Sequence, residues 1–159
     1  MRILLLAIVT ASALAHGQPG LAQEPGPKII LNKTKQGVAV AGYDPVSYFT
    51  DAGPQRGDPQ ITASHLGATY WFRSAANRDR FVREPAKFAP QYGGYCGYGA
   101  SRGYLASVDP EAFTIMNGRL ILQNSKSVLA LWKTEPEARL KLADENWPEI
   151  VEREGKPLP

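Results

Sequence analysis

The chain contains one cysteine, Cys96, and its thiol is the side chain best suited to chemistry. It lies in QYGGYCGYGASRGY, residues 91–104, among four tyrosines and five glycines. Thiolate and thioether sulfur are the ligands that Cu(I) prefers. A free cysteine also packs well as a small apolar residue. The residue types leave both roles open, and packing is the interpretation that we favour.

Few side chains are available to join Cys96 around a metal ion. They are the thioether of Met116, the imidazoles of His65 and His16, and carboxylates such as Asp44 and Asp109. A tetrahedral zinc site made of cysteine and histidine needs four such ligands, and one chain does not supply them. A two-coordinate copper site, or a site shared across a dimer, is still compatible with the sequence.

The tyrosines around Cys96 suggest a second kind of site, for a small organic ligand. Tyrosine suits a half-wet pocket, because it combines an apolar ring with a hydroxyl. The same rings often form the rim of a small core, and the glycines allow close approach of a ligand or of the chain itself. Asp44 precedes Pro45, so helix capping is the favoured interpretation of that carboxylate. The candidate ligand-binding residues are Tyr43, Asp44, Tyr92, Tyr95 and Tyr98.

A catalytic role has weaker support in the sequence. Cys96 and His65 are the residue types of a nucleophile and its base, but nothing in the sequence brings them together. A thiol redox enzyme requires an exposed sulfur with a depressed pKa. We therefore expect a protein that is not an enzyme, with thiol redox catalysis as the least favoured alternative.

Length and composition predict one modest globular domain. The chain has 159 residues, of which 43% are hydrophobic and 21% charged. Its formal charge of +3 is spread along the sequence, whereas a nucleic-acid-binding protein usually carries a basic stripe. After the first residues, no apolar run is long enough to span a bilayer. We expect neither nucleic-acid binding nor an integral membrane protein, and the partner would be a metal ion or a small ligand.

The N-terminus resembles a secretory leader. Arg2 precedes the apolar run ILLLAIVTASALA, which has the length of a signal-peptide core. Cleavage after Ala15 or after Ala22 is plausible, and we prefer Ala22. The expected organisation is a signal peptide at 1–22, a linker or arm at 23–36 and one domain at 37–153. The mature protein would be periplasmic or secreted.

The first half of the domain is expected to contain strands and short helices. GVAVAG at 37–42 has the alternation of a short strand, and a short helix is expected to begin at Asp44. Residues 51–59 are rich in glycine and proline and predict a loop. GATYWFRS at 67–74 predicts a strand, followed by a helix that Ser74 caps and Pro85 ends, with Phe81 facing inward.

The second half contains the clearest local signal. Asn117-Gly118 tolerates the backbone of a type I′ turn, so residues 113–122 predict a β-hairpin. Ser125 is expected to cap the next helix, and Thr134 with Glu137 a final helix that runs toward Trp147. Locally paired strands among helices predict an α+β fold: a small single domain with short antiparallel strands and several helices.

Several motifs, taken in order, resemble those of the YHS-domain family. GATYWFRSAANRDRFVREPAKFAP shares the family's strand ending, a following phenylalanine and a helix-stopping proline. GYDPVSYF, PQYGGYCGYG, DPEAFTI, NGRL and NWP are similar to motifs of its exported branch. The resemblance runs from about residue 38 to residue 150, nearly the whole expected mature chain.

This resemblance implies heavy-metal binding, with copper as the metal, through a pair of cysteines. The corresponding positions here are Arg73 and Asn77, neither of which is a soft ligand. Cys96 is therefore the main candidate contact, with Met116 and His65 beside it. The leading expectation is an exported, non-catalytic binding protein for copper; the alternative is a small-molecule or protein interaction module in which Cys96 is structural.

Overall fold

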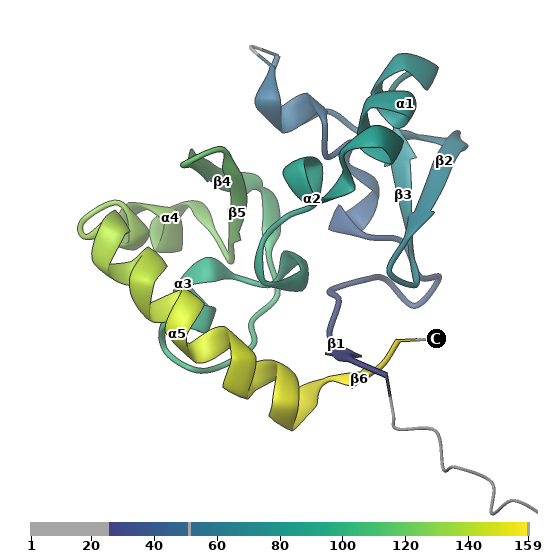
Figure 1. The fold of residues 1–159 in the computed structure, drawn as a ribbon. Coiled ribbons are helices and arrows are strands. Elements are labelled where there is room, and N and C mark those ends of the chain that lie inside the picture. Colours follow the sequence, from purple (N-terminus) through teal and green to yellow (C-terminus); the bar gives the residue numbers. More distant parts are fainter. Residues whose placement is uncertain (1–25, 51, 159) are drawn as a thin grey trace, which may run out of the picture.

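The computed structural model describes residues 26–50 and 52–158 (Figure 1). The expected signal peptide and its cleavage site lie outside these residues. Helices alternate with paired strands, which confirms the predicted α+β class. The strands are β1 (Lys28–Ile29), β2 (Asp58–His65), β3 (Ala68–Phe72), β4 (Asp109–Met116), β5 (Arg119–Gln123) and β6 (Lys156–Pro157). The helices are α1 (Ala75–Arg83), α2 (Pro85–Phe88), α3 (Gly97–Ser101), α4 (Lys126–Trp132) and α5 (Pro136–Glu154).

The strands form three antiparallel pairs: β1 with β6, β2 with β3, and β4 with β5. The last two pairs are hairpins closed by two-residue turns. The predicted Asn117-Gly118 turn is confirmed, because both residues have positive φ, 52° and 73°. The β4–β5 hairpin therefore follows directly from local sequence.

Strand β5 separates two clusters of buried side chains. Leu120 and Leu122 pack with β3, α1 and α2, whereas Ile121 packs with Trp132 and α5. All three leucine and isoleucine side chains are fully buried. Successive residues of a strand point to opposite faces, so the apolar residues LIL at 120–122 supply both clusters at once.

Serine caps were predicted correctly at two helices. Ser74 accepts a hydrogen bond from the Asn77 amide at 3.2 Å, and Ser125 accepts one from the Val128 amide at the same distance. The predicted cap at Thr134 is wrong. Glu135 occupies the N-cap of α5 without a side-chain bond, and the Thr134 hydroxyl donates to the Leu131 carbonyl of α4 instead.

The segment before residue 66 differs most from the expectation. Val38 and Ala39 form only isolated bridges. Val40–Gly42 then forms a 3₁₀ turn, because Val40 and Ala41 have left-handed φ values of 52° and 50° that end any strand there. The expected loop at 51–59 ends early, since Asp58 already begins β2. In place of a helix that begins at Asp44, a turn at Asp44 leads into a 3₁₀ helix at Ser47–Phe49.

The arm at the N-terminus is joined to the C-terminal end of the fold. β1 pairs with β6, which follows α5, and Figure 1 shows this pair beside the last turn of α5. The Asn32 amide then donates to the Gly93 carbonyl at 2.8 Å, and the Asn32 side chain donates to the Gly94 carbonyl at 3.0 Å. Residues 28–32 are thus held by two distant parts of the chain. Within the described part of the chain, no helix has the length and apolarity to cross a membrane.

Candidate functional site

Cys96 is a buried, fully bonded thiol. Its side chain is only 1% exposed. The sulfur lies 3.4 Å from the Gln123 Oε1 that accepts its hydrogen bond, and it receives the Gly99 amide at 3.5 Å as the N-cap of α3. Because both the donor and the acceptor functions of the thiol are used inside the protein, the geometry gives Cys96 a packing and capping role.

Gln123 is the partner that sequence reasoning missed. It is fully buried at the end of β5, and its Oε1 accepts hydrogen bonds from Cys96 and from the Tyr98 amide at 3.0 Å. A polar residue in the alternation RLILQ, on the same face as Ile121, was the available signal. Gly97 makes this contact possible, because a Cβ there would lie 2.5 Å from Cγ2 of Ile121.

The other two candidate metal ligands have separate partners. The Met116 sulfur accepts a hydrogen bond from Trp132 Nε1 at 3.3 Å. His65 packs edge-on against Phe81 with 5.8 Å between ring centroids, and burial lowers the pKa of its imidazole. Within residues 26–50 and 52–158, no group of three or more His, Cys, Asp or Glu side chains is placed to hold a metal ion.

Asp44 is fully buried and acts as a structural hub. Its Oδ1 accepts the Val46 amide at 2.9 Å, and its Oδ2 accepts the Arg73 amide at 2.9 Å and the Asn77 side chain at 2.6 Å. Arg73 and Asn77 occupy the positions that the YHS resemblance assigns to a soft ligand pair. In this chain they satisfy a buried carboxylate that links the first 3₁₀ turns to the start of α1.

Tyr92 belongs to a polar link between the β4–β5 hairpin and α5. Its hydroxyl donates to Asp144 Oδ1 at 2.8 Å, and Arg119 binds both oxygens of the same carboxylate, at 2.6 and 2.9 Å. Burial and the bond to Asp144 raise the pKa of Tyr92. The hydrogen bonds from Arg119 lower the pKa of Asp144. The Tyr92 hydroxyl is therefore engaged within the fold.

Tyr43 and Tyr98 each lie beneath a guanidinium group. Arg56 lies 4.9 Å from the ring centroid of Tyr43, and Arg139 lies 4.8 Å from that of Tyr98. The Tyr43 hydroxyl also donates to Glu111 at 3.3 Å. These cation–π contacts give both rings a partner from their own chain.

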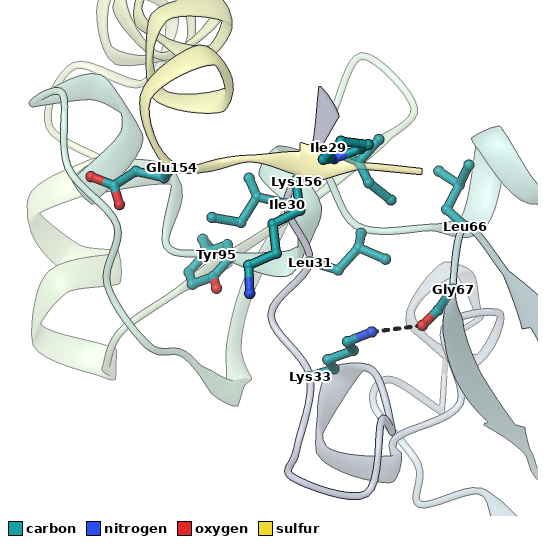
Figure 2. A pocket seen from close by; sticks show the side chains of 10 residues that line it. Ile29, Ile30, Leu31, Lys33, Leu66, Gly67, Tyr95, Glu154 and Lys156 are labelled. Atoms are coloured by element: carbon teal, nitrogen blue, oxygen red, sulfur yellow. Dashed lines mark hydrogen bonds between the residues drawn. The ribbon is translucent and has the colours of Figure 1, made fainter. Parts of the chain in front are cut away.

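Tyr95 is the predicted ligand-binding residue that borders a cavity (Figure 2). The cavity has a volume of about 420 Å³, within the range of small-ligand pockets. Burial, and then the charge of Glu154, raise the pKa of Tyr95. The N-terminal segment lines the cavity with Ile29, Ile30, Leu31 and Lys33, and the β2–β3 turn with Leu66 and Gly67. The chain after α5 adds Lys156 and Pro157, and Glu154 lies at the end of that helix.

Leu66 has an unusual backbone for its residue type. Leu66 and Gly67 form the two-residue turn between His65 and Ala68, with φ values of 49° and 76°. Asparagine or glycine normally occupies the first of these positions, as Asn117 does in the other hairpin. A bulky side chain in the left-handed region costs roughly 1–2 kcal/mol. The Leu66 side chain is nevertheless 41% exposed, at the rim of the cavity.

Comparison of the chain with protein-family models, with curated proteins and with solved structures found no match. The YHS resemblance therefore stays a prediction that rests on the sequence motifs.

Proposed function

We propose that this chain is a non-catalytic binding protein whose cavity at Tyr95 and Leu66 holds a small, largely apolar molecule. The conformation of Leu66 is the observation that carries this proposal. A turn that favours asparagine holds an exposed leucine, and backbone strain of this kind persists at functional sites where the side chain is needed. Binding is the function that such a side chain serves, because a bound apolar molecule would cover it.

The composition of the cavity wall supports the same function. Ile29, Ile30 and Leu31 supply apolar surface opposite the β2–β3 turn. None of the described residues that line the cavity is a histidine, cysteine or serine. The wall thus consists of groups that hold and orient a molecule, with Cys96 in a structural role elsewhere. Export from the cytoplasm, which the apolar leader predicts, is part of this proposal.

The test replaces Leu66 by the residue that the turn prefers. Leu66→Asn relieves the left-handed strain, so the free energy of unfolding should rise by about 0.5–1 kcal/mol. The same change removes apolar contact from the cavity and should weaken binding of a neutral dye such as Nile red five- to tenfold. Denaturant unfolding and a fluorescence titration of the purified protein measure the two effects.

Leu131→Asn is the matched control, since Leu131 is an exposed leucine of α4 that does not line the cavity. It should leave dye affinity unchanged. Equal dye affinity for Leu66→Asn and the unaltered protein would overturn the proposal, as would the absence of any dye binding.

A further inference from the structure

Two lysines from distant parts of the chain line the same cavity. Lys33 follows β1, and Lys156 begins β6 after α5. Figure 2 shows the side chain of Lys156 directed toward Tyr95 and the ammonium group of Lys33 directed toward Gly67. Pairing of β1 with β6 brings these two segments together.

Neither ammonium group is neutralised within the described part of the chain. No carboxylate of residues 26–50 or 52–158 lies within ion-pair distance of Lys33 or Lys156. The acidic residue at the cavity, Glu154, accepts a hydrogen bond from Arg153 at 3.1 Å, and its carboxylate points away from the cavity in Figure 2. With two ammonium groups against one carboxylate, the lining of the cavity carries a net positive charge beside its apolar wall.

The polar groups that line the cavity have hydrogen-bond donors that are not used within the described part of the chain. Lys33 uses one N–H to reach the Gly67 carbonyl, at 2.7 Å, and an ammonium group has three. The Tyr95 hydroxyl has no hydrogen-bond partner among the described residues, and a phenol is an O–H donor at neutral pH. Two ammonium groups and a phenol are donors that suit an anionic oxygen group.

We infer that the ligand of this cavity is an anionic amphiphile, an apolar chain that ends in a carboxylate or phosphate group. This inference rests on the proposed function, since it assigns the ligand class of the same cavity. The apolar part lies against Ile29, Ile30, Leu31 and Leu66. The anionic end lies between Lys33 and Lys156, where Tyr95 donates a further hydrogen bond.

The test compares molecules that differ only in their headgroup. Decanoate, decyl phosphate, decanol and decylammonium are each titrated against the purified protein loaded with the neutral dye. Both anions should displace the dye at concentrations about tenfold lower than decanol, and decylammonium should be the weakest. The more effective anion identifies the headgroup.

Variants locate the charge preference within the chain. Lys33→Met and Lys156→Met should each weaken displacement by the anions about tenfold, and displacement by decanol should not change. Lys156→Arg keeps the charge and should retain the preference. Lys35→Met is the matched control, because Lys35 is exposed nearby but does not line the cavity.

The two proposals fail in different ways. If the dye binds but decanol displaces it as well as decanoate, or if both methionine variants keep the preference for anions, this inference is overturned and the proposed function survives. If the dye does not bind, both are overturned.

Discussion

At the scale of single residues, side chains that were all candidates for ligand or metal binding have different roles in the fold. Cys96 is enclosed by Gln123 and the start of α3, and Asp44 is enclosed by donors from three segments. Tyr95 alone among the predicted ligand-binding residues borders the cavity around Leu66. Partners within the fold, more than residue type, separate structural groups from those available to a ligand.

Cys96 should behave as a structural thiol. Thiol reagents should label the native protein only as fast as the structure opens locally, and label it at once in denaturant. Cys96→Ser should lower the free energy of unfolding by about 1 kcal/mol, because serine keeps the polar contact to Gln123 and loses the larger sulfur. Cu(I) uptake under reducing conditions should be equal for both proteins. Fast native labelling, or copper uptake that depends on Cys96, would contradict this role.

At the scale of elements, a group of hydrogen bonds joins the β4–β5 hairpin to α5, which comes later in the chain. Arg119 of β5 binds Asp144 of α5 through two hydrogen bonds, and Tyr92 adds a third. The pair is half-exposed, so water screens its charge and it contributes at most about 1 kcal/mol. It joins α5 to the β4–β5 hairpin beside the apolar packing of Leu140 and Ala143.

The contribution of this link should depend on pH. The pKa of Asp144 lies below its ordinary 3.8 in the folded protein, so between the two values the unfolded chain binds more protons. The stabilisation is complete above 3.8 and is lost as pH falls through the folded value. Asp144→Asn should lower the free energy of unfolding by up to about 1 kcal/mol at pH 7. This gap in unfolding free energy between the variant and the unaltered protein should close below pH 3.8.

Denaturant unfolding at a series of pH values measures this gap. Glu145→Gln is the control on the same helix, since it breaks the exposed pair with Lys141 and should have a smaller effect. A gap for Asp144→Asn that stays constant into acid would refute the role of this carboxylate.

Local patterns predicted several elements because the causes of those elements are local. Asn117-Gly118 and the serine caps at Ser74 and Ser125 act through bonds within a few residues of themselves. Strand β2 and the irregular backbone at Val40 depend on partners elsewhere in the fold, so their sequences carried no clear signal. The same holds for the cavity, which combines segments from the two ends of the described chain.

At the scale of the molecule, the motif around Cys96 supports the N-terminal arm. Gly93 has a φ of +57°, and a Cβ there would lie 2.0 Å from the Ile30 carbonyl oxygen. The arm passes over this glycine and then lines the cavity through Ile29, Ile30 and Leu31. The glycine thus allows close approach of the chain itself, one of the two interpretations that its sequence context left open.

Gly93→Ala should therefore detach the arm. Hydrogen exchange at residues 28–32 should become faster, and affinity for the neutral dye should fall. Gly103→Ala is the matched control, because Gly103 also has positive φ, +80°, but nothing lies within 4 Å of an added Cβ. Both variants carry the left-handed strain of about 1 kcal/mol; only Gly93→Ala adds the clash. Equal exchange rates in the two variants would show that the arm does not depend on Gly93.

The sequence by itself determined the α+β class, the β4–β5 hairpin and two capped helices, because turn geometry and capping act over a few residues. It also singled out the motif around Cys96. Only the tertiary structure decided what that motif does: β5 covers the thiol with Gln123, and the arm covers Gly93 and Gly94. Only the fold placed Lys33, Leu66, Tyr95 and Lys156 around one cavity. Such contacts join residues far apart in the chain, and no local pattern specifies them.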